Sequence, residues 1–301
     1  TDPRFALATA RTLFGGITGL PVLTAETIGN DELDADVYQL QRNFLDEVAQ
    51  AFVDSNYDIR VVIERIVLSH YFRTIGHEGA SDAQLAQAGT AHLLTPEELA
   101  RKIESVTGYP WAERYDRAAY LLDRYRMLYG GIDSNAVTER LVEPNGIMSS
   151  IGLRLSYDLA CRTVAHDFVL PREQRRLFPK VEPSYEPETL DGFSIPDVEN
   201  LIKENIQYLH LRLLGEELAL DDPELEATYA LFYETWQEGK AALDAGDETN
   251  WMQWRCQANY DFWTRQVLPN EHRLRQDPTF IIRAWMATMT YLLSDYRFFY
   301  E

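Results

Sequence analysis

Cysteine is scarce in this chain of 301 residues, and its scarcity excludes several kinds of cofactor site. Cys161 and Cys256 are the only two cysteines, and neither belongs to a C-x-x-C or C-x-x-C-H motif. This argues against a covalently attached haem, a zinc ribbon or a thioredoxin-like centre within these residues. One disulfide formed in an oxidising compartment and two separate buried thiols are equally compatible with this pair.

Long apolar runs are missing as well, because charged residues interrupt each hydrophobic stretch within a few positions. A membrane-spanning helix needs about 20 consecutive apolar residues, so we expect no membrane span. The chain begins at Thr1 without a preceding signal peptide. We therefore expect either a processed protein or one portion of a longer chain.

Positive charge is in short supply, since 28 lysines and arginines stand against 48 aspartates and glutamates, for a formal net charge of -20. Such a chain repels phosphate backbones, and its short basic stretch, 172–180, is interrupted by a glutamate, so we expect no nucleic-acid binding. An acidic surface is typical of a secreted protein, or of one that docks a basic partner such as a small cytochrome.

The common catalytic motifs are also absent. The sequence has no G-x-S-x-G elbow, no phosphate-binding glycine loop and no dinucleotide fingerprint. Its six histidines form neither an H-x-x-x-H pair nor an H-E-x-x-H motif, so we expect no metal site. On a helix, Cys161 and His166 would point away from each other, which argues against a cysteine–histidine nucleophile. The sequence assigns no catalytic residue and leaves open whether the protein is an enzyme.

Helical periodicity, in contrast, runs along most of the chain. Apolar residues recur at helical spacing within 38–55 and again from Ile59 to about Phe72, which predicts an antiparallel helical hairpin. Further helix starts are marked by a capping side chain near an early proline, at Thr95, Ser194, Asp222 and Asp277. We predict an all-α fold, a multi-helix bundle of mostly antiparallel amphipathic helices with no significant sheet.

Two stretches of different composition bear on the domain organisation. Residues 74–91 are rich in Gly, Ala, Gln, Ser and Asp, which predicts a surface connection. Residues 177–192 contain three prolines and predict an extended linker. We therefore predict an N-terminal helical domain over 1–176 and a C-terminal helical domain over 193–301, which either fold separately or share one core.

One polar, glycine-containing stretch, 129–146, and the helix expected after it offer a candidate pocket, because such a join between helices can shape a binding site. The candidate residues are Asp133, Ser134, Asn135, Arg140, Asn145, Arg154, Asp158 and Arg162. The stretch also fits a structural interpretation, in which Gly130-Gly131 ends one helix, Ser134 or Asp133 caps a short one, and Asn145-Gly146 turns into the next. Arg154, Asp158 and Arg162 are four positions apart, so they form either a structural ladder of charges or, if buried, a site for an anionic group.

Several segments resemble a known family. They are DPRFALATARTLFGGITG, LDEVAQAFVDSNYDIRVVIERIVLSHYFR, LLTPEELARKIESVTGYPW and YLLDRYRMLYGGIDSNAVTERLVEPNGIMSS, which together span roughly the first 170 residues. These segments are similar to the helical C-terminal domain of planctomycete-type cytochrome c-associated proteins of uncharacterised function. The resemblance implies an exported protein in which this domain follows a c-type cytochrome region. Because C-x-x-C-H is absent here, any haem c would lie upstream of Thr1 or on a partner chain.

These observations favour an extracytoplasmic interaction or scaffold module, periplasmic or extracellular, which associates with a c-type cytochrome domain or another subunit of a redox assembly. Two alternatives stay open. One is an enzyme, either an oxidoreductase or a polysaccharide-active protein, with its pocket around 129–162. The other is a subunit of an extracellular assembly, which would make the protein an oligomer.

Overall fold

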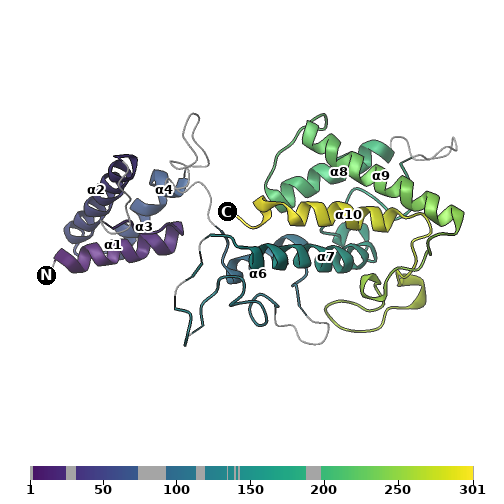
Figure 1. Cartoon of the computed structure of the whole chain (residues 1–301), viewed down its shortest axis with the longest axis horizontal. Coiled ribbons are helices and arrows are strands. Elements are labelled where there is room, and N and C mark those ends of the chain that lie inside the picture. The colour runs from purple at the N-terminus through teal and green to yellow at the C-terminus, as the bar shows by residue number, and fades with distance from the viewer. Residues whose placement is uncertain are drawn as a thin grey trace. The chain divides into compact units, whose positions relative to one another are not determined.

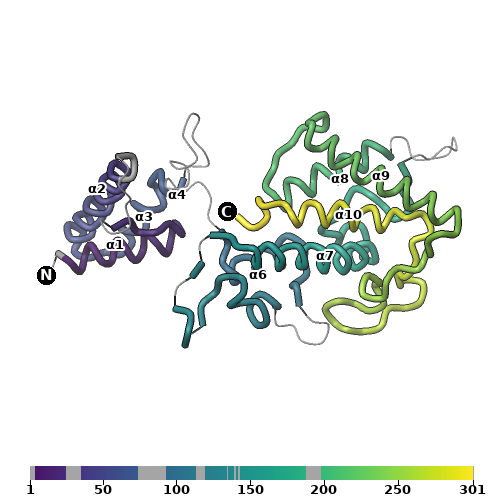
Figure 2. Tube along the Cα trace, viewed as in Figure 1, coloured from purple at the N-terminus to yellow at the C-terminus, as the bar shows by residue number. Residues whose placement is uncertain are grey.

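The computed structural model describes residues 3–24, 32–73, 93–112, 119–133, 135–138, 140–141, 143–187 and 198–300. Within these ranges, nine α-helices dominate, and the β contacts are isolated bridges, which confirms the predicted all-α class. Figure 1 shows the helices, and Figure 2 follows the same chain as a trace. The chain divides into two compact units, Thr1–His92 and Leu93–Glu301.

This division differs from the predicted boundary at 177–192. The described part of that stretch is no exposed linker, because Leu177, Phe178 and Val181 are buried in the core of the second unit. The side chain of Asn205 fixes the stretch further, since its Nδ2 donates to the Leu177 carbonyl at 3.0 Å. Residues 93–176 of the predicted N-terminal domain therefore share one core, from Leu94 to Phe298, with the predicted C-terminal domain. The predicted connection 74–91 lies outside the described residues.

The first unit is a small helical bundle with its own core. Its helices are α1 (Pro3–Thr18), α2 (Glu32–Asp54), α3 (Ile59–Val67) and α4 (His70–Arg73). The predicted hairpin is present, and its turn uses positive φ angles of 57° at Asn56 and 66° at Tyr57. Its second helix ends earlier than predicted, at Val67, and α4 is a separate turn. Aromatic and aliphatic side chains fill the core, among them Phe14, Phe52 and Ile66.

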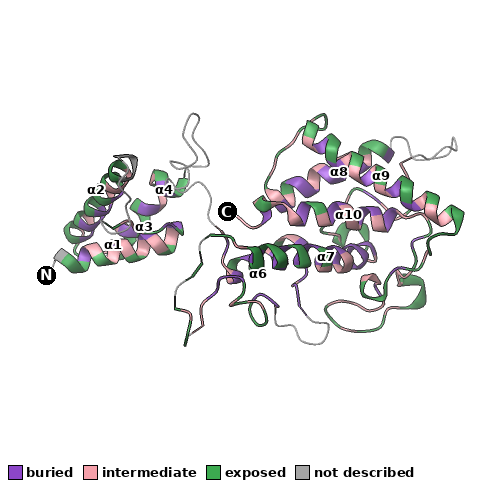
Figure 3. Ribbon diagram, viewed as in Figure 1, coloured by how far each residue is buried: buried purple, intermediate pink, exposed green. Residues whose placement is uncertain are grey.

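The second unit is built around α10. Its helices are α6 (Pro96–Thr107), α7 (Gly146–Phe168), α8 (Val198–Leu209), α9 (Pro223–Ala245) and α10 (Ile281–Ser294). Helix α10 packs against α7 and α9, and α8 packs against α9. Buried side chains recur along these helices (Figure 3). The largest buried side chain of α10 is that of Trp285, which contacts Phe178 and Phe232.

Short turns complete this unit. They are 3-10 turns at Arg172–Gln174, Trp254–Cys256, Asn270–His272 and Tyr296–Phe298, and a π-helical turn at His210–Leu214. The long connection from α9 to α10, residues 246–280, is here called the α9–α10 loop. It folds back on itself through bridges that pair Trp251 with Gln276, Ala258 with Leu274 and Tyr260 with Val267.

Two predicted helix starts are confirmed and one is wrong. Thr95 forms a capping box with Glu98, and Asp222 caps α9 through the backbone N–H of Glu224. Helix α10, however, begins at Ile281, three residues beyond the predicted proline. The Asp277 carboxylate still accepts from the first N–H groups of the helix, while Phe280 turns through a positive φ of 63° between them. The start near Ser194 lies outside the described residues.

Candidate functional site

The predicted residues of the 129–146 stretch stabilise local turns. The Asp133 Oδ1 atom accepts from the backbone N–H groups of Asn135, Ala136 and Val137 at 2.9, 2.6 and 2.9 Å. These hydrogen bonds lower the pKa of Asp133. Asn145 caps α7 by accepting from the backbone of Ile147 and Met148. Asn135 is exposed, and Ser134 lies outside the described residues.

The arginines of the predicted pocket have structural partners as well. Arg140 forms an ion pair of 3.0 Å with Glu97 at the start of α6, and Arg154 lies 3.7 Å from Asp158 on α7. Arg162 donates to the carbonyl of Ala112. The Arg154 side chain is 57% exposed, so the three ladder charges do not form a buried anion site. These contacts favour the structural interpretation of the stretch and its ladder.

The described part of the second unit instead has two cavities that combine aromatic and charged side chains. The first, here called the disulfide groove, has a volume of about 630 Å³. Its lining comes from α7, α10 and the α9–α10 loop: Tyr157, Asp158, Cys161, Glu248, Thr249, Trp251, Met252, Gln253, Arg255, Cys256, Phe280, Arg283, Met286, Ala287 and Thr290. Asp158 is thus the one predicted pocket residue in this lining.

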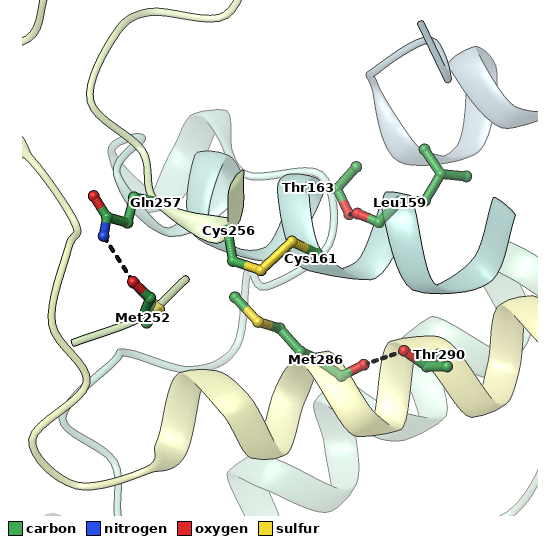
Figure 4. Close-up of a disulfide and its surroundings, with 8 residues drawn as sticks. All are labelled: Leu159, Cys161, Thr163, Met252, Cys256, Gln257, Met286 and Thr290. Atoms are coloured by element: carbon green, nitrogen blue, oxygen red, sulfur yellow. Dashed lines mark hydrogen bonds between the residues drawn. A yellow bond between two sulfur atoms is a disulfide. The ribbon is translucent and has the colours of Figure 1, made fainter. Parts of the chain in front are cut away.

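A disulfide between Cys161 and Cys256 forms part of this groove and resolves the alternative that the sequence left open. It ties the α9–α10 loop to the middle of α7. Figure 4 shows Met286 of α10 pointing toward the two sulfur atoms, with Met252 on the neighbouring segment. The Gln257 amide donates to the Met252 carbonyl at 2.7 Å and holds the loop beside the disulfide (Figure 4).

Large aromatic side chains stand exposed at the groove. Trp251 is 51% exposed and Tyr157 is 64% exposed, although both line the same cavity. Phe280 lines it from the start of α10, with the Arg283 guanidinium 4.1 Å above its ring. Phe280 can take this position because Gly239 faces it, where a Cβ atom would lie 2.1 Å from the ring. The groove therefore combines rigid rings with a fixed positive group.

Acidic and basic side chains share the lining of the groove. Glu248 and Asp158 line the cavity together with Arg255 and Arg283. Glu248 lies 3.6 Å from Arg283, whose guanidinium also binds the buried Asp277 at 3.2 Å. The two carboxylates and the two guanidinium groups of the lining therefore balance, and the excess of negative charge belongs to the chain as a whole.

The second cavity, here called the aromatic pocket, is smaller and has a volume of about 350 Å³. Three segments form it, from the end of α6, the end of α7 with the turn after it, and the tip of the α9–α10 loop. Its lining residues are Gly108, Tyr109, His166, Asp167, Val169, Leu170, Gln174, Arg176, Tyr260, Asp261, Phe262, Trp263 and Leu268.

Aromatic rings surround His166 in this pocket. The imidazole is buried, with ring centroids 5.2 Å from Tyr260, 5.7 Å from Phe262 and 6.1 Å from Tyr109. Tyr109 and Phe262 meet edge to face at 4.8 Å. Trp263 packs against Phe262 at the outer side and is 43% exposed. The rings form a wall with an exposed edge.

Two carboxylates hold the walls of the aromatic pocket in place. Asp167, which is fully buried, accepts from the backbone N–H groups of Arg176, Leu177 and Phe178 at 2.9 to 3.0 Å. Burial raises the pKa of Asp167, although these hydrogen bonds oppose the shift. Asp261 uses Oδ1 to accept from the backbone of Trp263 and Thr264 at the loop tip.

The charged groups of the pocket converge on Tyr109. Burial raises the pKa of its hydroxyl, and the charges of Asp167 and Asp261 raise it further, while Arg176 lowers it. Burial also acts to raise the pKa of Asp261, but hydrogen bonds from Thr264 and Trp263 and the nearby His166 leave it lowered. A cavity with perturbed titratable groups from separate segments is a typical candidate for a functional site.

Sequence reasoning missed this pocket because its residues are far apart in the chain. The structure places Cys161 in the disulfide groove and His166 in the aromatic pocket, and the sulfur of Cys161 is bonded to Cys256, which excludes the cysteine–histidine pair. The sequence offers one weak signal, the cluster of aromatic residues from Tyr260 to Trp263 around an aspartate.

Two further findings concern the described part of the chain. It holds no group of three or more His, Cys, Asp or Glu side chains placed to bind a metal ion. None of its helices combines the length and the apolar character needed to cross a membrane. In comparisons with known proteins, the chain matches no family model, and no curated protein or solved structure matches it significantly.

Proposed function

We propose that the Leu93–Glu301 unit is an extracytoplasmic interaction module that docks a basic redox protein, such as a c-type cytochrome domain, at the disulfide groove. The observation that carries this proposal is the pair of exposed rings, Trp251 and Tyr157, in one groove of a strongly acidic protein. The protein contributes a shaped contact surface, while any haem belongs to the partner.

The disulfide supports the compartment in this proposal. Cys161 and Cys256 account for all the cysteine in the chain, and they are bonded. Disulfides persist in the periplasm and outside the cell, whereas reducing systems in the cytosol keep thiols reduced. The bond also fixes the α9–α10 loop, which carries Trp251, onto α7, which carries Tyr157. A surface that is rigid before binding loses little conformational entropy when the partner docks.

The residue types of the groove support a protein partner. Tryptophan, tyrosine, methionine and arginine are enriched at the centres of protein interfaces, and all four types line this groove. The net charge of -20 favours a basic protein and accelerates its approach. The resemblance to cytochrome c-associated proteins stays a prediction, and it names the same class of partner.

Binding of the full chain to a purified basic c-type cytochrome tests this proposal. We expect binding by surface plasmon resonance that weakens strongly between about 0.01 M and about 0.1 M salt, because the Debye length falls from about 30 to about 10 Å. Trp251→Ala should weaken binding by roughly tenfold or more, as loss of an interface tryptophan commonly does. Trp254→Ala is the matched control, since Trp254 is 63% exposed and does not line the groove.

Two results would contradict the proposal. Equal loss of affinity in Trp251→Ala and Trp254→Ala would show that the groove is not the contact surface. Absence of salt-dependent binding to the basic cytochrome would remove this class of partner. An acidic c-type cytochrome run under the same conditions serves as the negative control, because charge repulsion should suppress its association.

A further inference from the structure

The aromatic pocket holds polar groups that the fold itself does not use. The Arg176 guanidinium forms no hydrogen bond or ion pair with the described residues, although the chain is strongly acidic. The side chain of Gln174 is exposed at the pocket and is likewise without a hydrogen bond to described residues. Asp261 accepts its hydrogen bonds from the loop tip through Oδ1 alone, and Oδ2 accepts from no described donor. A donor, an amide and an acceptor are therefore available at one cavity.

We propose that this pocket binds one sugar residue of a carbohydrate chain. A pyranose has an apolar C–H face and an edge of hydroxyl groups, each of which both donates and accepts. The exposed ring of Trp263 offers flat apolar surface to the first, and Tyr109 and Tyr260 also line the pocket. Arg176 and Asp261 offer a donor and an acceptor to the second. The inference is independent of docking at the disulfide groove.

Other ligand classes fit the pocket less well. The positive charge of Arg176 would repel an organic cation, and the carboxylate of Asp261 would repel a phosphate. A macrocycle such as haem needs far more room, since about 350 Å³ lies at the lower end of the roughly 300–1,000 Å³ of small-ligand pockets. A neutral ligand with hydroxyl groups can contact both the guanidinium and the carboxylate without repulsion.

The pocket is also held in shape before a ligand arrives. Asp261 fixes the loop tip that carries Trp263, and Asp167 fixes the backbone of Arg176. The Arg176 stem lies directly on Gly108, where a Cβ atom would come within 2.7 Å of Cδ. Gly108 has a positive φ of 84° at the end of α6, so a side chain is disfavoured there for two reasons. Such preorganisation lowers the entropic cost of binding.

Isothermal titration calorimetry of the full chain with cellotriose, xylotriose, chitotriose and mannotriose tests the inference. We expect at least one of these to bind and to change the tryptophan fluorescence, because Trp263 lines the pocket. Trp263→Ala and Arg176→Gln should each weaken that binding by roughly tenfold or more, since each removes a contact with one face of the sugar.

Matched controls come from the same chain. Trp254→Ala removes a tryptophan and Arg101→Gln an exposed arginine, and neither residue lines the aromatic pocket, so both variants should bind as the wild type does. Failure of all four oligosaccharides to bind would overturn the assignment. Binding that survives in both Trp263→Ala and Arg176→Gln would also overturn it, because the sugar would then lie elsewhere on the protein.

Discussion

At the scale of single residues, Asp167 and Asp261 use their carboxylates in different ways. Asp167 needs both oxygen atoms, since Oδ1 accepts from Arg176 and Oδ2 from Leu177 and Phe178. Asp261 takes its three hydrogen bonds on Oδ1 alone. An asparagine offers one acceptor oxygen and one donor amide, so it can replace the second carboxylate but not the first.

This difference predicts unequal effects of one conservative change. Asp167→Asn should lower the free energy of unfolding by about 3 kcal/mol. Its NH2 group would replace one acceptor oxygen and leave a buried backbone N–H without a hydrogen-bond partner. Asp261→Asn should cost less than about 1 kcal/mol, because its carbonyl keeps the loop-tip hydrogen bonds. Urea denaturation of both variants measures the difference. Equal losses would show that Asp167 is not held by both of its oxygens.

Local chemistry is also what the sequence predicts best at this scale. Asn145 caps a helix and Asp133 closes a turn, and both roles follow from a side chain that bonds to backbone within four positions. The sequence could not reveal that Arg140 would pair with Glu97, because that contact joins residues far apart in the chain. The sequence predicts a pocket here because Asp and Asn are common in binding sites, whereas in this fold these side chains cap a helix and close a turn.

At the scale of elements, the π-helical turn after α8 positions a buried histidine. His210 Nδ1 lies 2.9 Å from Glu216 Oε2, and Nε2 lies 3.0 Å from the hydroxyl of Thr228 on α9. Burial lowers the pKa of His210 from its usual 6.5, and the charge of Arg297 lowers it further. Nearby carboxylates, Glu224 foremost, act to raise the pKa, but the net shift is downward. The folded protein therefore holds this ring neutral at pH values where the unfolded chain is already protonated.

The sign of the pH dependence follows from this shift. Below pH 6.5 the unfolded state takes up a proton that the native state does not, so stability falls as the solution is acidified toward the lowered pKa of His210. The slope for one group is at most about 1.4 kcal/mol per pH unit. His210→Gln should flatten the dependence by this amount in denaturant titrations at a series of pH values. An unchanged slope would contradict the buried neutral state.

Helix boundaries show where sequence rules succeed and fail. Thr95 and Asp222 start α6 and α9 as predicted, because a cap and an early proline lie within one turn of each other. The same rule misplaces the start of α10, because Phe280 breaks the backbone with a positive φ. The space that accepts the Phe280 ring belongs to Gly239 on another helix. No local pattern contains that information.

At the scale of the whole molecule, the positions of the prolines do not predict where one compact unit ends and the next begins. Pro179 and Pro183 lie in a stretch that suggested a linker, yet Phe178 and Val181 beside them are fully buried. The aromatic pocket was unpredictable for a related reason, since it joins residues from Gly108 to Leu268 through tertiary packing. Periodicity predicts which residues are buried, but not which buried faces meet.

The two units have separate cores and only the second contains cysteine, which predicts separate responses to reduction. The Cys161–Cys256 bond closes a span of 95 residues, so its loss should lower the stability of Leu93–Glu301 by about 2–4 kcal/mol. The Thr1–His92 unit should be unaffected. Differential scanning calorimetry should therefore show two transitions, of which a reductant lowers only one.

A variant that carries both Cys161→Ser and Cys256→Ser provides the control, because without reductant it should reproduce the scan of the reduced wild type. Reductant should then cause no further change in that variant. If a single transition moved as a whole, the two units would unfold as one cooperative body. If neither transition moved, the bond would contribute nothing to the stability of the second unit, and the α9–α10 loop would owe its position to packing alone.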